Sequence, residues 1–419
     1  MSSKVTLFGE VPDDWVVSEI GEIAELRQGL QISKKLRVSA DVKESIPLLK
    51  ITDLPSGIFS EYVKDIPENY IASKDDIIYT RTGQVGLVYT NIQGCVHNNC
   101  FKVILDYNNF DKDYIYYYLN SKTIWKYSNS VAGGSVQKDL THGAFKKCLI
   151  AYPKLDEQRS IGKILSSLDK KIETNNQINK KLEEMAQAIF KQWFVDFEFP
   201  SGDGEPYKSS GGEMVESEMG MIPKGWEVKN ITELVDSVSI KHKFDKNEII
   251  FLNTSDIFNG EVLQTKYSEV STLPGQAKKS IKKDDILYSE IRPQNRRFAY
   301  VDFVADDYVV STKLMVLRAK THISSAIIYF LLTNSRIIDE LQMIAESRSG
   351  TFPQITFNNL KDIKIAVPKD NSLNDKLELF QSILNKMCCI RNENKKLNDI
   401  RDNILPKLMS GEIRVPINN

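Results

Sequence analysis

Two long stretches of the chain carry apolar residues at spacings that alternate between three and four positions. They cover residues 156–192 and 375–411 and align with each other without a gap. The matched apolar pairs are Ile161/Phe380, Ile164/Ile383, Leu168/Met387, Ile178/Leu397, Met185/Ile404 and Ile189/Leu408. This alternation is the heptad spacing of helices that pack along a seam. The pattern therefore predicts two long helices that form a coiled coil.

The same seam holds one asparagine at the midpoint of each predicted helix, Asn175 and Asn394. If the helices pair in antiparallel orientation, the two asparagines face each other. A buried polar pair of this kind fixes register and orientation at some cost in stability. Two solvent-facing helix centres are the alternative. The shared midpoint favours antiparallel pairing, with Asn175 and Asn394 setting the helix register.

The segment before the first predicted helix is similar in sequence to the segment before the second. The matching segments are VPDDW (11–15) with IPKGW (222–226), KDDIIYTRTG (74–83) with KDDILYSEIR (283–292), and KKCLIAYP (146–153) with KDIKIAVP (361–368). Short β-branched runs such as DDIIYT and KLMVLRA predict strands, and longer runs such as DYIYYYLNSKTIWKYSNS predict helices. A long internal repeat indicates one structural unit used twice. The predicted fold class is α/β (α+β): two tandem mixed domains separated by two long antiparallel helices, with pseudo-twofold symmetry.

These patterns divide the chain into five segments. They are a first domain at 1–154, a central helix at 155–200, a linker at 201–220, a second domain at 221–370 and a C-terminal helix at 371–419. The linker has five Gly, five acidic residues and one Lys, so it cannot bury a core. We expect a flexible tether or a disordered loop that joins the two copies.

Composition bounds the class of protein. Hydrophobic residues make up 41% and charged residues 26%, as in an ordinary globular protein. No apolar run is long enough for a membrane span, and the first residues lack a signal pattern. Five cysteines with no framework spacing indicate a reducing, cytoplasmic setting. A formal net charge of −1 neither demands nor excludes nucleic acid, and it argues against a histone-like binder.

Motifs for catalysis are missing from the sequence. It has no G-x-x-x-x-G-K-[ST] phosphate loop, no G-x-G-x-x-G and no Pro-Pro dipeptide, which the Asn-Pro-Pro-aromatic site of adenine methyltransferases needs. The segment CVHNNC offers Cys95, His97 and Cys100 without a fourth nearby ligand and at poor spacing for zinc. We interpret it as a strand and loop with a buried thiol. We therefore expect no catalytic residues, no metal and no cofactor on this chain.

Three stretches resemble the DNA-specificity subunit of type I restriction–modification enzymes. They are LDEQRSIGKILSSLDKKIETN (155–175), AIFKQWFVDFEFPSGDGEPYKSSGGEMVESEMGMIPKGWEV (188–228) and ILPKLMSGEIRV (404–415), and the resemblance extends over essentially the whole chain. It implies two target-recognition domains that each read half of a split DNA site, as two-fold proteins mirror their operators. It also implies helical regions that dock two methyltransferase subunits, with restriction and translocase subunits joining the complex. S-adenosylmethionine and ATP are then expected only on those partners.

Base readout needs Arg, Lys, Asn or Gln side chains that reach groove edges, often from loops that contain glycine. Two such loops recur in each copy, at 80–86 and 132–140 and again at 290–298 and 346–356. The candidate DNA-binding residues are Arg81, Gln84, Gln137, Lys138, Arg292, Gln294, Asn295, Arg296, Arg297, Arg348 and Gln354. For each arginine the alternative is a solvated or ion-paired side chain. The basic tract SIKHKF (239–244) is a further candidate, for phosphate more than for bases.

Two rival functions and one local alternative remain open at this stage. The rivals are a stand-alone DNA methyltransferase or nuclease, and a scaffold with two peptide-binding domains. The missing motifs count against the first. Locally, Phe190, Trp193 and Phe194 at the end of the first helix either dock a partner subunit or cap the core of the adjoining domain.

Overall fold

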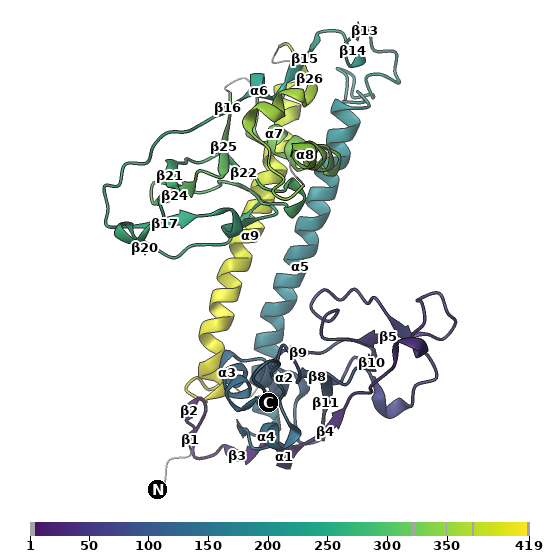
Figure 1. Ribbon diagram of the computed structural model, residues 1–419, viewed down its shortest axis with the longest axis vertical. Helices are drawn as coiled ribbons and strands as arrows, with labels where there is room; N and C mark the ends of the chain where they lie inside the picture. Colours follow the sequence, from purple (N-terminus) through teal and green to yellow (C-terminus); the bar gives the residue numbers. More distant parts are fainter. Residues whose placement is uncertain (1–4, 321–322, 349, 371–372, 417–419) are drawn as a thin grey trace. The chain divides into compact units, whose positions relative to one another are not determined.

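The computed structural model describes residues 5–320, 323–348, 350–370 and 373–416. The chain divides into two compact units. The first combines residues 1–173 with 395–419, and the second is continuous from 174 to 394. Two long helices, α5 (Leu155–Phe194) and α9 (Asn374–Met409), contribute one part to each unit (Figure 1). The division therefore falls inside the helices and not at their ends.

The first unit is built on two four-stranded sheets. The larger has the order β4 (Ala24–Gln28), β11 (Cys100–Leu105), β8 (Ile77–Thr80) and β9 (Val88–Tyr89). The smaller has the order β6 (Tyr62–Val63), β5 (Ile46–Leu49), β10 (Gly94–Val96) and β7 (Ile71–Ala72). Two strand pairs complete it, β3 (Val16–Glu19) with β12 (Leu149–Tyr152) and β1 (Val5–Thr6) with β2 (Gly9–Glu10). All four residues of β8 are buried, as expected for a strand covered on both faces.

Short helices pack on the larger sheet of the first unit. They are α1 (Ile20–Ile23), α2 (Lys112–Leu119), α3 (Lys122–Val131) and α4 (His142–Lys146). The last three begin at residues whose side chains accept a backbone N–H of the first turn, namely Asp111, Ser121 and Thr141. Such caps satisfy donors that a helix start leaves without partners. The sequence thereby fixes where each helix begins.

The second unit repeats the strand order of both four-stranded sheets. Its larger sheet has the order β16 (Val235–Ser237), β25 (Leu314–Ala319), β22 (Ile286–Ser289) and β23 (Phe298–Tyr300). Its smaller sheet has the order β20 (Ser268–Glu269), β17 (Glu248–Leu252), β24 (Tyr308–Ser311) and β21 (Ala277–Ser280). The remaining strand pairs are β15 (Trp226–Asn230) with β26 (Lys364–Pro368), β13 (Met214–Ser217) with β14 (Gly220–Pro223), and β18 (Ile257–Phe258) with β19 (Glu261–Val262). Its helices are α6 (Ile231–Leu234), α7 (Ser325–Thr333) and α8 (Ser335–Arg348). The predicted mixed α/β fold with two copies of one domain is confirmed.

The repeated Pro-x-x-Trp motif anchors the first strand of each domain. Trp15 is fully buried in the core of the first unit. Trp226 is buried in the second, where its ring stacks on Phe199 with centroids 4.9 Å apart and contacts Phe197 edge-on. A buried tryptophan contributes a large apolar area at a defined orientation. The motif recurs because each copy starts its domain with the same anchor.

The two long helices run antiparallel inside the second unit. The side-chain amide of Asn175 donates to the Asn394 Oδ1 at 2.8 Å, and Phe190 contacts Phe380 with ring centroids 6.2 Å apart. Asn175 is almost fully buried and also donates to Glu393 at 2.8 Å. The structure thus places the two register asparagines in direct contact. In the first unit Asp169 and Arg401 form the corresponding ion pair, 2.7 Å apart.

The heptad prediction for the first helix is only partly correct. Ile164, Ile178 and Met185 are exposed by 37%, 39% and 54%, whereas Leu165 and Ala186 are buried. The residues at heptad positions of α5 are not the same as its buried residues, because α5 packs on elements of the domains as well as on α9. For example, the Gln187 amide donates to the Phe330 carbonyl of α7 at 3.0 Å. The side chains of Ile164, Ile178 and Met185 are therefore exposed on α5, and we call the positions of Ile178 and Met185 the outer line of this helix.

The aromatics at the end of α5 cap the core of the second unit. Phe190, Trp193 and Phe194 are 4%, 8% and 3% exposed and contact the Phe380 ring. The alternative in which these side chains dock a partner is wrong, since their surface is already buried inside the unit.

The acidic linker has more local structure than its composition predicts. Tyr207 stacks on Phe199 with ring centroids 4.7 Å apart, and its hydroxyl donates to the Glu213 carbonyl at 3.0 Å. The hairpin of β13 and β14 follows directly. Tyr207 thus ties the Gly-rich segment to the core, together with the ion pair between Glu218 and Lys364, and bulk composition does not reveal these contacts.

Candidate nucleic-acid interface

Two loops of the first unit meet at the end of the larger sheet. The backbone N–H of Gly83 donates to the Lys138 carbonyl at 2.9 Å, and that of Leu140 donates to the Arg81 carbonyl at 2.9 Å. Gly83 has a φ of +84°, which favours glycine. The loops 80–86 and 132–140, both predicted to bind DNA, therefore form one joint surface.

Arg81 connects the two loops through its side chain. Its guanidinium donates to the Asp139 carboxylate at 2.6 Å and to the Gln28 Oε1 at 2.9 Å. The Thr82 hydroxyl also donates to Asp139, and together with Arg81 it lowers the pKa of that carboxyl. With a side chain only 22% exposed, Arg81 organises the surface. Its role as a base contact stays a prediction.

The other candidates of the first unit are exposed. Lys138 donates to the carbonyl and side-chain oxygens of Asn129 at 3.2 and 3.1 Å. The side chains of Gln84 and Gln137 are exposed and have no hydrogen-bond partner among the described residues. An amide that is both donor and acceptor and is not engaged within the protein is suited to read a base edge.

The second unit joins its two loops in the same way. The backbone N–H of Ile355 donates to the Glu290 carbonyl at 2.8 Å, and that of Arg292 donates to the Pro353 carbonyl at 3.1 Å. Arg292 and Arg296 have φ values of +44° and +50° and flank a short 3-10 turn, η5 (Pro293–Asn295). Such conformations cost non-glycine residues on the order of 1–3 kcal/mol and concentrate at functional sites.

The candidates of the second unit differ in how tightly they are held. The Arg297 Nη1 donates to the carbonyls of Ser255 and Ile257 at 3.1 Å, and the guanidinium lies 5.4 Å from the centre of the Phe258 ring, so it is held within the protein. Arg292 is exposed and makes one long contact of 3.4 Å to the Thr351 carbonyl. Arg292 is therefore the freer of the two to reach a ligand.

The remaining candidates lie around the same turn. Arg296 contacts the Ser335 hydroxyl at 3.5 Å, and the Gln354 Oε1 accepts from Lys313 at 3.1 Å. Gln294 and Asn295 are exposed. Arg348 ends α8, and its side chain lies outside the described residues. Most of these side chains, although scattered over the sequence, come together at one edge of the second unit.

Charge is inverted between the two copies at this edge. Arg81 and Glu290 each directly follow the buried strand of their copy, β8 or β22, so they are repeat equivalents. Arg81 is paired with Asp139, whereas Glu290 lies 3.7 Å from the ammonium of Lys313. The same backbone frame thus presents a different donor and acceptor pattern in each unit. Different patterns select different bases.

Sequence reasoning missed Gln28, Asp139, Glu290 and Lys313, which hold the candidates in place. For Glu290 a signal was present, because the repeat aligns TR of the first copy with SE of the second. Gln28 gave none, since only folding brings β4 beside the loop after β8.

The basic tract 239–244 lies beside strand β21. Lys241 forms an isolated antiparallel bridge with Lys279, and the backbone N–H of His242 donates to the Lys278 carbonyl at 2.7 Å. The tract thus extends the outer edge of the smaller sheet in the second unit. Lys241 and Lys243 are exposed there.

The cysteines of the CVHNNC segment are buried. Burial raises the pKa of the Cys95 thiol to about 11 and that of Cys100 to about 12. Thiols of this kind stay protonated at neutral pH, whereas metal ligation requires the thiolate. Within the described residues, no group of three or more His, Cys, Asp or Glu side chains is arranged to hold a metal ion.

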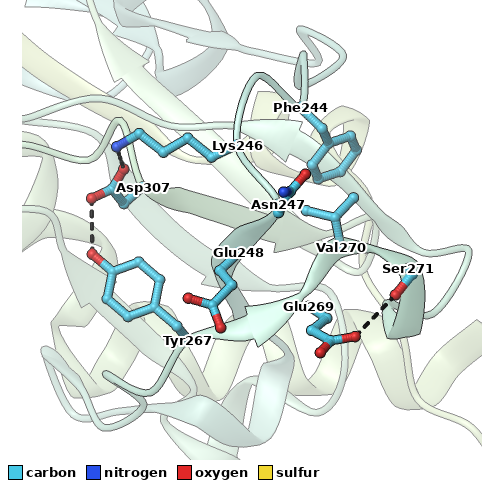
Figure 2. Close-up of a pocket in the computed structure, with 9 residues that line it drawn as sticks. All are labelled: Phe244, Lys246, Asn247, Glu248, Tyr267, Glu269, Val270, Ser271 and Asp307. Carbon is cyan, nitrogen blue, oxygen red and sulfur yellow. Dashed lines mark hydrogen bonds and ion pairs between the residues drawn. The ribbon is translucent and has the colours of Figure 1, made fainter.

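An open pocket of about 1040 Å³ lies at the other edge of the smaller sheet, beside β17 and β20 (Figure 2). Asp307 is paired there with Lys246 and accepts from the Tyr267 hydroxyl at 2.9 Å. Glu248 and Glu269 stand directly opposite each other on neighbouring strands. Two facing carboxylates repel phosphate, so this edge is unsuited to a nucleic-acid backbone. None of the described helices combines the length and apolar character needed to span a bilayer.

Comparisons with known proteins agree with this architecture. The family model of the type I restriction modification DNA specificity domain matches residues 12–184 and 223–401. The MjaIX specificity subunit of Methanocaldococcus jannaschii is 25% identical over 98% of this chain and 96% of its own length. The HindI specificity subunit of Haemophilus influenzae is 44% identical over 35% of each chain. The crystal structure of an S subunit from M. genitalium shares the fold, with a TM-score of 0.62 and 17% identity over 97% of this chain and 99% of that one.

Proposed function

Because this chain belongs to the family of type I restriction–modification DNA specificity subunits, we propose that its two domains each read one half of a split duplex target. One observation carries the proposal: the same pair of joined loops occurs in both units with a different set of exposed polar side chains. A shared frame places each domain on a duplex in the same way. Different side chains then select different bases in the two halves.

The chain supplies recognition, and partner subunits supply the chemistry. The described residues offer no arrangement for holding a metal, and the sequence has no phosphate loop. We propose that S-adenosylmethionine and ATP bind to the methyltransferase and translocase partners that the family resemblance implies. The rival of a stand-alone methyltransferase or nuclease has no support from the comparisons.

The isolated chain is expected to transfer no methyl groups to DNA. Incubation with a labelled methyl donor and duplex should leave the DNA unlabelled, because no acid–base or cofactor site is available. Addition of the methyltransferase partner should produce labelling at one split motif. Robust labelling by the chain alone would contradict the proposal.

A binding measurement separates recognition from a scaffold role. The motif is first identified by methylome sequencing of a host strain with and without this chain. The complex should then bind a duplex with that motif about 10³-fold or more tightly than a scrambled duplex. Equal affinity for both duplexes would favour the scaffold with peptide-binding domains.

The outer line of α5 is the surface that we assign to the methyltransferase partner. Ile178 and Met185, both in the second unit, are one heptad apart and stay exposed on one side of the helix. Exposed apolar side chains in a row are typical of an interface. We assign this line to the partner in place of Phe190, Trp193 and Phe194, because the side chains of those three residues are buried.

The double substitution Ile178→Glu and Met185→Glu should weaken association with the methyltransferase about tenfold or more, because anchors at an interface contribute above about 1 kcal/mol each. Analytical ultracentrifugation of the mixed subunits measures this. Lys180→Glu is the control, since it changes net charge equally at an exposed position about 200° around the helix. Equal weakening by both variants would show that charge, and not the apolar line, is responsible.

A further inference from the structure

The smaller sheet of the second unit is polarised in charge. Its strand order is β20–β17–β24–β21 (Figure 1). Glu248 and Glu269 lie at the β20 edge (Figure 2), and a group of lysines lies at the β21 edge. The edge strands β20 and β21 are roughly 14 Å apart, at three intervals of about 4.8 Å. The segment 243–247 runs from the β21 edge to the acidic pocket, which Phe244 and Lys246 line. A polyanion that approaches this sheet is therefore attracted to the β21 edge and repelled from the β20 edge.

The lysine edge consists of Lys241, Lys243 and Lys278. All three are exposed, and no ion pair is recorded for any of them within the described residues. By contrast, the nearby Lys246 is paired with Asp307 at the acidic edge. Lysines that are gathered without carboxylate partners leave their charge available to an external anion.

The strand pairing concentrates this charge further. Lys241 stands opposite Lys279 in the bridge that attaches the tract to β21. Like charges directly opposite each other on paired strands are destabilising. Lys279 is half-buried and its ammonium donates to the carbonyls of Thr312 and Leu314 at 3.0 and 2.8 Å. Its ammonium is held in place at this edge, and the Glu290 carboxylate offsets part of its charge, so an anion would relieve the repulsion that remains.

The lysine edge adjoins the joined loops. Lys279 fixes the backbone on both sides of Lys313, and Lys313 in turn donates to Gln354 of the second loop. Strand β21, which carries Lys278 and Lys279, is therefore connected to the candidate base-reading surface by two consecutive contacts, from Lys279 to the backbone beside Lys313 and from Lys313 to Gln354. Lysine acts as a flexible point charge, which suits phosphate better than the directional edge of a base.

We propose that the lysine edge holds the phosphate backbone of the duplex next to the half-site read by the second domain. This rests on the proposed function and adds the contact that positions the domain. Phosphate contacts fix the register and orientation of a protein on the duplex without selecting the sequence. The acidic β20 edge also favours this orientation of the domain, since it repels a duplex that approaches from the other side.

The test measures how DNA affinity depends on salt. The full chain, combined with its methyltransferase partner, is titrated with a duplex that carries the motif at several NaCl concentrations. The variant Lys241→Ala, Lys243→Ala, Lys278→Ala should reduce the slope of log K against log salt by about two to three, because each phosphate contact contributes about 0.9. The ratio of affinities for the motif and a scrambled duplex should stay unchanged.

Two companion variants sharpen the result. Replacement of the same three lysines by arginine should restore the wild-type slope, because it keeps the charge. Lys246→Ala should leave the slope unchanged, since that lysine serves Asp307 at the opposite edge. Thermal melting of each variant checks that the fold is intact.

Each outcome decides between the alternatives. An unchanged slope in the alanine variant overturns the proposal, and so does a loss of discrimination against the scrambled duplex, which would indicate base reading. Weaker association with the methyltransferase at an unchanged slope would assign the edge to a protein partner and also overturns it. If the wild-type complex does not prefer the motif, the proposed function itself fails, whatever the slope.

Discussion

Replacing Arg292 by alanine is expected to weaken binding to the target duplex by roughly 1–3 kcal/mol and to relax selectivity in one half of the target only. Arg292 is exposed at the joined loops, and within the described part of the chain its guanidinium makes one long contact, to the Thr351 carbonyl. If it reads a guanine, its loss removes a bidentate contact without disturbing the loop. Methylated motifs sequenced from a strain with the variant measure the change directly.

Two variants serve as controls for the Arg292 prediction. Arg297→Ala removes an arginine of the same loop whose guanidinium is bound inside the protein, so it should lower thermal stability without relaxing one base position. Gln84→Ala should relax the other half of the target, because Gln84 belongs to the first unit. Uniform weakening over all sequences in Arg292→Ala would instead identify a phosphate contact.

Lengthening both long helices by one turn is expected to lengthen the spacer of the recognised motif by one or two base pairs. Four residues inserted after Glu173 in α5 and four after Asn394 in α9 leave the contacts inside each compact unit intact. They add about 6 Å and rotate the helix by about 40° beyond a full turn. One base pair adds about 3.4 Å and about 35°. The half-site bases should stay the same.

An insertion in α5 alone tests whether the pair of helices acts together. It should lower thermal stability or methylation, because α9 then cannot follow α5 without losing contacts. Methylome sequencing of both variants reports the spacer. An unchanged spacer with altered half-sites would show that the helices do not determine the spacing.

The repeat allowed much of the fold to be predicted from the sequence. The two repeated sequence segments align, with predicted strands at matching positions, and this implied two domains of one topology. The sheets have the same strand order in both units. The heptad pattern was less reliable, because a helix that packs on a domain and on another helix buries more than one line. Ala186 is fully buried, yet the heptad pattern of large apolar residues did not mark this position, because its side chain is small. The Gly-rich linker was also misjudged, since Tyr207 stacks on Phe199 of the core and Glu218 pairs with Lys364.

The candidate site was predictable as a set of loops and not as a set of contacts. Glycines and polar residues marked all four loops, and folding joins them in two pairs. The partners of each arginine depend on strand register, which brings Gln28 of β4 beside Arg81 from far away in the sequence. Arg297 looked equivalent to Arg292 in the sequence, yet only the structure shows that its guanidinium is occupied.

The division of the two units along the chain has a consequence for synthesis. The second unit uses one continuous segment, 174–394, whereas the first has to wait for residues 395–416, which supply Leu408 and Met409 to its core. Contacts between such distant segments have a high contact order, and they close late. During translation we therefore expect the second recognition domain to be the first to complete its core, although its residues are made after most of the other unit. The first domain stays a partly assembled intermediate, with apolar surface exposed to chaperones, until the last turns of α9 leave the ribosome.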